Sequence, residues 1–243
     1  MVDSATHYRF LLAKHYCWML GKAFEDAVTE QRREFVELGI GSGHHGLAVD
    51  LGCGPGHQAA ALADLGFGRV LALDTSQILL DELIGHTGER PIEPIRDDIL
   101  KLAQYAPNAS VDVVVCMGDT LPHLESVAHV RTLLEACWEA LRPSGRFLLT
   151  FRDYSEALKG LDRIIPVRLD ADRLMTCILD YAPDHVEVTD LLHIRAGSGW
   201  DLHKSSYRKL RLIPDEVVAL LCALGFAVTP VAGGMLKIVA IKP

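Results

Sequence analysis

Apolar residues recur along the chain with two different spacings, one typical of helices and the other of strands. Residues 7–38 carry apolar side chains near helical spacing, with Gly21 as a break between two helices. Short apolar runs then alternate with helical segments at 57–65, 76–84 and 127–141; the runs lie at 47–51, 69–74, 92–96, 111–117 and 145–151. Strands that alternate with helices at this spacing predict a mostly parallel sheet with helices on both faces.

After residue 160 the rhythm changes to three extended segments, 173–182, 185–197 and 200–212, which predict an antiparallel meander. A helix at 214–226 and two strands, 227–231 and 235–241, close the chain. We therefore expect an α/β fold: a doubly wound, Rossmann-like, seven-stranded and mostly parallel sheet with an inserted antiparallel β meander and N-terminal helices. Residues 1–243 are expected to form a single domain, with N-terminal helices at 1–46, a ligand-binding core at 47–155, the inserted sheet at 160–212 and the closing elements at 213–243.

Composition narrows the classes of partner. The 243 residues include 24 basic and 32 acidic ones, a net charge of −8, and 49% of them are hydrophobic. This composition is typical of a folded globular protein, and an acidic chain without a Lys/Arg block argues against nucleic acid or a membrane as partner. Six cysteines without a C-x-x-C pair favour a reducing, cytoplasmic location. We expect no metal site, because the adjacent His44 and His45 do not have metal-ligand spacing.

A glycine-rich segment, Asp50-Leu51-Gly52-Cys53-Gly54-Pro55-Gly56, follows the first expected strand directly. Glycines allow a sharp turn and a close approach of the backbone to a ligand, and open α/β sheets bind ligands at this position. Gly54, Gly56 and Ala59 fit the dinucleotide pattern G-x-G-x-x-G/A, whereas residues 50–56 fit acidic-x-G-x-G-x-G in full. The acidic Asp50 would repel a pyrophosphate and suits a cationic ligand.

Further acidic residues, Asp74 and Asp98, follow the second and third expected strands. Together with residues 50–56 they resemble the motifs of class I S-adenosylmethionine-dependent methyltransferases. The resemblance implies S-adenosylmethionine as cofactor and S-adenosylhomocysteine as product. It places the ribose at Asp74 and Thr75, the adenine at Asp98 and Ile99, and the rest of the cofactor along the loop at Asp50, Gly52, Cys53, Gly54 and Gly56.

Two later segments, 116–124 and 151–154, resemble the glycine N-methyltransferases and their small-molecule relatives. This resemblance implies that Met117, Gly118 and His123 lie near the methionine end of the cofactor. Asp119 stands where the family has an asparagine that contacts substrate, and Arg152 matches an arginine that binds a substrate carboxylate. The candidate catalytic residues are therefore Asp119, His123 and Arg152, with His123 or Asp119 as a base.

The acidic Asp119 changes the expected acceptor, because a carboxylate repels a substrate carboxylate and attracts an ammonium, unless it simply pairs with Arg152. We expect in-line methyl transfer to a nitrogen (or oxygen) of a small molecule, such as an amine or amino-acid-like acceptor. The resemblance also implies that the N-terminal helices form a lid. Candidate substrate-binding residues, some by location only, are Tyr16, Trp18, Asp119, Arg152, Tyr154, Trp200 and Tyr207. Three alternatives stay open: a carboxylate or hydroxyl O-methyltransferase, an NAD-type oxidoreductase, and a catalytically inactive cofactor-binding scaffold.

Overall fold

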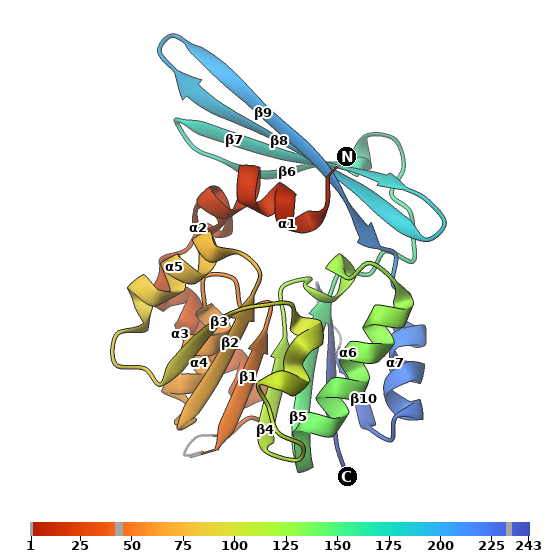
Figure 1. Ribbon diagram of the computed structural model, residues 1–243. Coiled ribbons are helices and arrows are strands. Elements are labelled where there is room, and N and C mark those ends of the chain that lie inside the picture. Colours follow the sequence, from red (N-terminus) through yellow and green to blue (C-terminus); the bar gives the residue numbers. More distant parts are fainter. Residues whose placement is uncertain (1, 42–45, 232–234) are drawn as a thin grey trace.

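The computed structural model describes residues 2–41, 46–231 and 235–243, and its strands form two sheets (Figure 1). The larger sheet has seven strands in the order β10-β11-β5-β4-β1-β2-β3. Their bounds are β1 Leu47–Leu51, β2 Arg69–Asp74, β3 Ile92–Arg96, β4 Val111–Cys116, β5 Leu141–Phe151, β10 Ala227–Val231 and β11 Leu236–Ile241. Strands β1 to β5 pair in parallel, and β11 pairs antiparallel with β5 and β10. The expected seven-stranded, mostly parallel sheet is confirmed.

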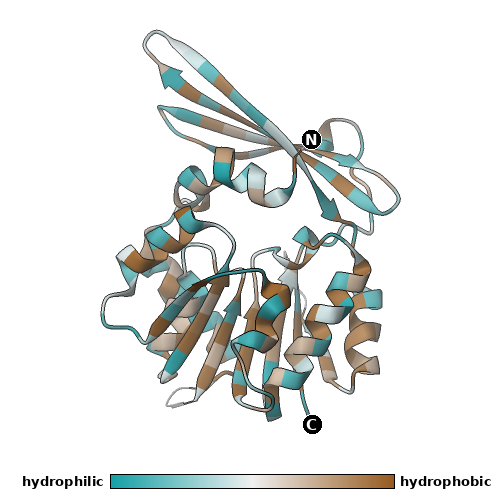
Figure 2. Cartoon of the chain, in the orientation of Figure 1, coloured by the Kyte–Doolittle hydropathy of each residue, from teal (hydrophilic) through white to brown (hydrophobic). Residues whose placement is uncertain are grey.

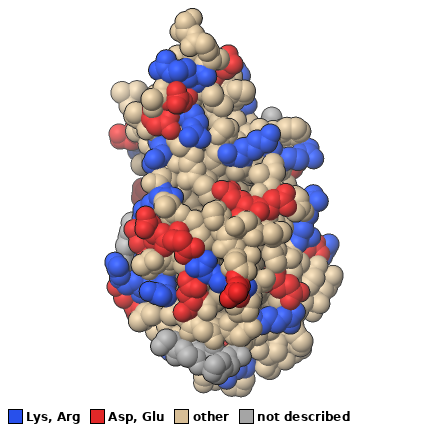
Figure 3. Space-filling model, turned by 90° about the vertical axis from the view of Figure 1, so that its left-hand side faces the viewer, with Lys and Arg blue, Asp and Glu red and all other residues tan. Residues whose placement is uncertain are grey.

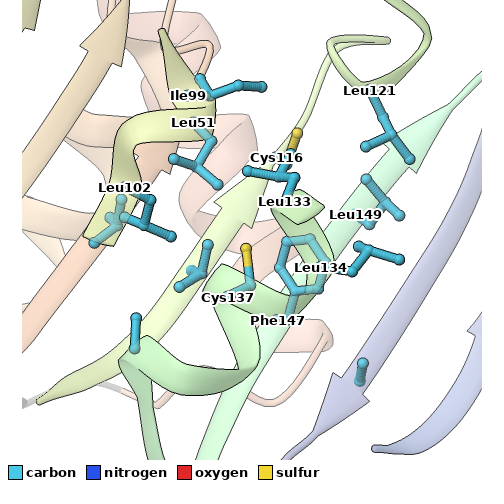
Figure 4. Packing of buried hydrophobic residues seen from close by; sticks show 14 of the residues in the cluster. Leu51, Ile99, Leu102, Cys116, Leu121, Leu133, Leu134, Cys137, Phe147 and Leu149 are labelled. Carbon is cyan, nitrogen blue, oxygen red and sulfur yellow. The ribbon is translucent and has the colours of Figure 1, made fainter. Parts of the chain in front are cut away.

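Helices cover both faces of this sheet. One face carries α3 (Phe24–Glu37), α4 (His57–Asp64) and α5 (Gln77–Thr87), and the other carries α6 (Val127–Ala140) and α7 (Pro214–Ala223) (Figure 1). Strand β4 is apolar at nearly every position because its side chains alternate between the two faces. Val114 and Cys116 enter the cluster under α6, whereas Val113 and Val115 enter the cluster under α4. Figure 4 shows part of the first cluster, where Phe147 and Leu149 of β5 lie beside Leu134 and Cys137.

The second sheet, here called the capping sheet, is antiparallel with the order β6-β7-β8-β9. Its strands are β6 Ile164–Leu169, β7 Arg173–Tyr181, β8 His185–Ala196 and β9 Gly199–Leu210. The expected meander accounts for β7, β8 and β9, whereas β6 was not predicted. Pro166 interrupts the hydrophobic alternation of β6 and lies at an irregularity in its register, so a period of two was not visible there.

The N-terminal helices lie between the two sheets (Figure 1). They run as α1 (Ser4–His7), a π-helix (Tyr8–Leu12), a 3₁₀ turn (Ala13–His15) and α2 (Tyr16–Leu20). Gly21 ends α2 with a φ of 73°, as the expected break requires. Leu11 and Leu12 pack against Met175 and Leu192 of the capping sheet, and the buried His7 Nε2–H donates to Asp190 Oδ2 at 2.9 Å.

The fold does not decide every expectation drawn from the sequence. The division of the chain into one domain with four regions remains a prediction of the sequence. His44 and His45 lie outside the described residues. Within the described ranges, no helix combines the length and the hydropathy that a membrane crossing requires.

The contribution of the core to the free energy of unfolding can be tested at Phe147. Phe147 is fully buried between β5 and the helices, so Phe147→Ala is expected to lower the free energy of unfolding by about 3–5 kcal/mol in urea titrations. Phe10, which is 72% exposed, is the matched control, and Phe10→Ala is expected to change that free energy by less than about 0.5 kcal/mol. Equal effects of the two substitutions would contradict this packing.

Candidate functional site

The glycine loop joins β1 to α4 at the end of the sheet where the parallel strands terminate. Gly52, Gly54 and Gly56 have φ values of 72°, 54° and 92°, a region that favours glycine. A Cβ on Gly52 would collide with the side chain of Thr120, and one on Gly56 with Leu83. A Cβ on Gly54 would meet only Tyr16 Cε1, at 3.9 Å. Gly54 is therefore the position at which the loop faces open space.

Asp74, at the end of β2, holds the loop in place. Its Oδ2 accepts a hydrogen bond from the Gly54 N–H at 2.9 Å, and its Oδ1 accepts one from the Ser76 N–H at 2.8 Å. Burial raises the pKa of Asp74. Because each carboxylate oxygen can accept two hydrogen bonds, both retain capacity for ligand hydroxyls.

Asp50 is buried beneath the loop, with 1% of its surface exposed. Its Oδ2 has no hydrogen-bond partner among the described residues. Burial, and secondarily the charge of Asp74, raises the pKa of Asp50 to about 8. The backbone N–H of Ala59 donates to the carboxyl group. A buried carboxylate oxygen without a partner is costly, and a cationic group of a ligand would relieve that cost.

Asp98 and Ile99 follow β3, as expected. Asp98 caps the 3₁₀ helix Ile99–Gln104, and its Oδ1 accepts the Leu100 N–H at 2.9 Å. Both residues line a cavity on the same side of the sheet as Asp74 and Thr75. The structure therefore brings the expected strand-end residues to one edge of the sheet.

Two adjoining cavities lie over these strand ends, beneath the capping sheet. The first, of about 190 Å³, extends from the glycine loop to Tyr8, Tyr16, Met117 and Gly118. The second, of about 620 Å³, extends from Asp98 to Lys209. They share the lining residues Ser4, Ala5, Gly52, Asp74, Thr75, Thr120 and His123. This is the position where β1 separates the strands that follow it, β2 and β3, from β4 and β5, the site at which open α/β sheets bind ligands.

His123 lies at the junction of the two cavities, on the 3₁₀ turn Leu121–His123. Its ring stacks on Tyr207 with centroids 5.5 Å apart and meets the edge of Tyr8 at 5.6 Å. Burial, together with the positive charge of Lys209, lowers the pKa of His123 well below its usual range. His123 is therefore neutral at pH 7 and carries a free nitrogen lone pair.

Asp119 has a partner that the sequence did not reveal. Its carboxylate is buried: Oδ1 accepts the backbone N–H of Arg152 at 2.9 Å, and Oδ2 accepts from Lys209 Nζ at 2.5 Å. The Arg152 side chain is half exposed, and its Nε lies 4.0 Å from Asp119. Lys209 lies two residues from Tyr207, on the same face of β9. That spacing of two was the one sequence signal that could have indicated Lys209.

Several expected residues lie elsewhere. Tyr154 and Tyr207 are buried in a cluster with Leu179, Val186 and Val188, where Tyr207 backs His123 without lining either cavity. The Trp18 indole N–H donates to Asp170 at 2.5 Å, and Trp200 is 45% exposed beneath Arg195. The expected site residues that do not line either cavity also include Trp18, Asp50, Gly56, Asp119, Arg152 and Trp200. Cys53 is buried in the loop and lines the first cavity.

Comparison with known proteins gives one family and a set of similar folds. Residues 48–145 match the family described as a methyltransferase domain. An amino pentose methyltransferase from Micromonospora echinaspora is 17% identical, with a TM-score of 0.75 over 96% of this chain and 98% of that chain. A sugar N-methyltransferase from Streptoalloteichus is 16% identical, with a TM-score of 0.74 over 95% and 92%.

A third similar structure is an S-adenosylmethionine-dependent methyltransferase from Clostridium acetobutylicum, 14% identical with a TM-score of 0.73 over 98% of this chain and 96% of that chain. No curated protein matches the sequence. At these identities the structural likeness shows the fold, and it extends over both the larger sheet and the capping sheet because nearly the whole chain is covered.

The buried ion pair of Asp119 and Lys209 is expected to stabilise the fold. Lys209→Met leaves a buried carboxylate without its cation, and we expect it to lower the free energy of unfolding by about 3–5 kcal/mol. Adding Asp119→Asn to that variant removes the unpaired charge and is expected to restore most of the loss. Urea titration measures both, with the exposed Lys204→Met on the same strand as control. Equal effects of the two lysine substitutions would show that the pair contributes no stability.

Proposed function

We propose that the chain is a class I S-adenosylmethionine-dependent methyltransferase and that it transfers the methyl group to an amine nitrogen of a small polar acceptor. The observation that carries the proposal is the pair of adjoining cavities with the neutral His123 at their junction. One cavity begins at the glycine loop and the other ends at Lys209. A cofactor and an acceptor in these two spaces would meet beside His123.

The first cavity and the residues around it fit S-adenosylmethionine, the cofactor of this family. The open side of Gly54 admits a ligand against the backbone. Asp50 lies behind the cavity lining, and its unpaired Oδ2 would favour the cationic groups of that ligand through its charge. Asp74 would hold the ribose hydroxyls, Asp98 and Ile99 the adenine, and Met117 and Gly118 the methionine end. When bound, the cofactor supplies a methyl group on a positively charged sulfur, with a neutral thioether as the leaving group.

The chain's own contribution is to orient the acceptor, exclude water and remove a proton. Tyr8 and Tyr16 cover the first cavity from the N-terminal helices. Burial of an acceptor amine lowers its pKa, which favours the neutral form that can act as a nucleophile. The neutral His123 can accept a proton from that nitrogen. His123 is accordingly the proposed base, whereas Asp119 is held by Lys209 and serves to position the end of β4.

Charge and the similar structures favour an amine over a carboxylate. Besides Asp98, which would hold the adenine, Glu125 and Asp184 line the second cavity and would oppose an acceptor carboxylate. Of the basic residues in that lining, Lys209 is already paired with Asp119, whereas Arg208 would attract a carboxylate. Two similar folds are described as methyltransferases of an amino pentose and of a sugar nitrogen. O-methylation of a hydroxyl is the second candidate, because the same cavity would admit it.

The same proposal includes a small molecule as partner and a cytoplasmic location. All six cysteines are free thiols, in keeping with a reducing compartment. On the face drawn in Figure 3, Lys and Arg side chains are interspersed with Asp and Glu side chains. That face therefore offers no continuous basic surface for a phosphate backbone.

Methyl transfer can be tested with cofactor that carries a ¹³C-labelled methyl group. We expect small polyfunctional amines, amino sugars included, to yield N-¹³CH₃ products by NMR, and hydroxyl analogues of matched shape to yield none. His123→Gln is expected to lower kcat while leaving cofactor affinity nearly unchanged, because the base acts on the acceptor. Label only on oxygen would support the O-methyltransferase alternative, and binding without turnover over the whole panel would support the inactive scaffold.

Asp50 predicts a pH dependence of cofactor affinity. Its pKa of about 8 makes the carboxyl largely protonated at pH 6, and a bound cation favours the ionised form. Affinity is therefore expected to rise as the pH increases from about 6 to 7.5, by up to about tenfold per pH unit, with release of a proton on binding. Titration calorimetry in buffers of different ionisation enthalpy measures that proton.

Asp50→Asn is the matched control, since the amide keeps the shape but does not titrate. It is expected to bind more weakly, with affinity that is flat over the same pH range. A flat profile for the unmodified protein, or an equal slope in the variant, would contradict the role of Asp50.

A further inference from the structure

The capping sheet has one covered face and one open face. The N-terminal helices and the larger sheet lie on the inner side, and no described element lies on the other (Figure 1). Inward positions hold the buried residues Met175, Leu179, Val186, Val188 and Leu192. Because successive side chains of a strand point to opposite faces, the residues between these positions form the open side, here called the outer face.

The outer face is unusually apolar for a surface that faces water. The strand register places there Leu174 and Ile178 of β7, Leu191 of β8, and Trp200 and Leu202 of β9. Ile164 and Leu169 continue the face on β6. Leu169 is 70% exposed, Leu202 49%, Trp200 45%, Ile164 44% and Leu174 39%. Figure 2 shows hydrophobic and hydrophilic residues alternating along β8 and β9.

We propose that the outer face binds the same face of a second copy of this chain, giving a two-fold symmetric dimer through stacked capping sheets. Two-fold dimers are the commonest assemblies, and they use one self-complementary patch. Sheets with apolar faces pack face to face about 10 Å apart. Pairing through the free edge of β6 is disfavoured, since Pro166 lacks an N–H and the register is irregular beside it.

The area of the face is sufficient for a dimer. Four strands spaced about 4.8 Å apart, each with about nine residues at about 3.3 Å, cover roughly 570 Å² per copy. Two copies then bury about 1,100 Å² in projection, which exceeds the roughly 1,000 Å² expected of a specific interface. The exposed leucine, isoleucine and tryptophan side chains within this area form the apolar part of such an interface, and the charged residues between them form its polar part.

The charges on the face select the orientation of the two copies. Arg195, beside Trp200, lies at one end of β8, and Glu187 lies at the other end, between Asp180 of β7 and Arg208 of β9. A two-fold axis across the strands places Arg195 of each copy opposite Glu187 of the other. An axis along the strands would place Arg195 opposite Arg195. The first arrangement is complementary, and it leaves Lys204 of the edge strand β9 at the rim, in contact with water.

The dimer can be tested by sedimentation equilibrium over a range of protein concentrations. We expect twice the chain mass of 26.7 kDa for the unmodified protein, and a single chain mass for Leu169→Glu combined with Leu202→Glu. Phe10→Glu, at a 72% exposed position on the N-terminal π-helix, is the matched control and is expected to remain dimeric. Circular dichroism verifies that each variant is folded.

Charge exchange tests the orientation separately. Glu187→Arg and Arg195→Glu are each expected to raise the dimer Kd about tenfold, because each change affects two symmetric contacts, and their combination is expected to restore it. A monomeric unmodified protein, mass that grows beyond two chains, or equal dissociation of Phe10→Glu would overturn the proposal. An unchanged dimer Kd in both single charge variants would overturn the orientation in which Arg195 of each copy lies opposite Glu187 of the other.

Discussion

The contact between Asp119 and Lys209 connects the two sheets across the site, and the shape of the cavities depends on it. Asp119 extends from the end of β4, where the backbone N–H of Arg152 also holds it, and Lys209 belongs to β9 of the capping sheet. Removing two charges from water is costly, and only close, fully hydrogen-bonded geometry repays that cost. The pair therefore sets the height of β9 above the strand ends. Tyr207 lies two residues away on the same face, so the same contact fixes the ring on which His123 stacks.

Charge is distributed unevenly between the two ends of the site. This difference explains how the two adjoining cavities can serve a cofactor and an acceptor. At the glycine loop, Asp50 Oδ2 has no hydrogen-bond partner among the described residues, and burial raises the pKa of this carboxyl group. At the far end, Asp119 is satisfied by Lys209. A cationic ligand therefore gains most beside the loop, while Glu125 and Asp184 at the acceptor end would oppose a carboxylate. Asp50 therefore contributes its negative charge mainly when a cationic ligand is bound, because the ligand favours the ionised form.

The sequence predicts those features that depend on neighbours along the chain. The valine-rich β4, the glycine loop and the acidic strand ends were visible because local geometry alone requires those residue types. Lys209 was not predicted, because it meets Asp119 only when the capping sheet folds over residues 90 positions away. Trp18 and Trp200 were selected for their location in the N-terminal helices and the meander. Trp18 instead donates to Asp170 and lies beneath Arg173, and strand alternation places Trp200 on the outer face. Strand β6 was missed because Pro166 removes the period that would reveal it.

The capping sheet differs from a simple cover in two respects, a pair of buried charged residues on its inner face and exposed apolar residues on its outer face. A sheet that only shielded the site would carry apolar residues inward and polar ones outward. Here the inner face includes the buried Asp190 and Lys209, each paired across to another element, while the outer face carries exposed leucine, isoleucine and tryptophan. Because β9 supplies both faces, a shift of one residue in its register would exchange Lys209 and Tyr207 with their outward neighbours. The apolar outer face and the polar inner contacts therefore constrain the same register, and the acceptor cavity depends on both.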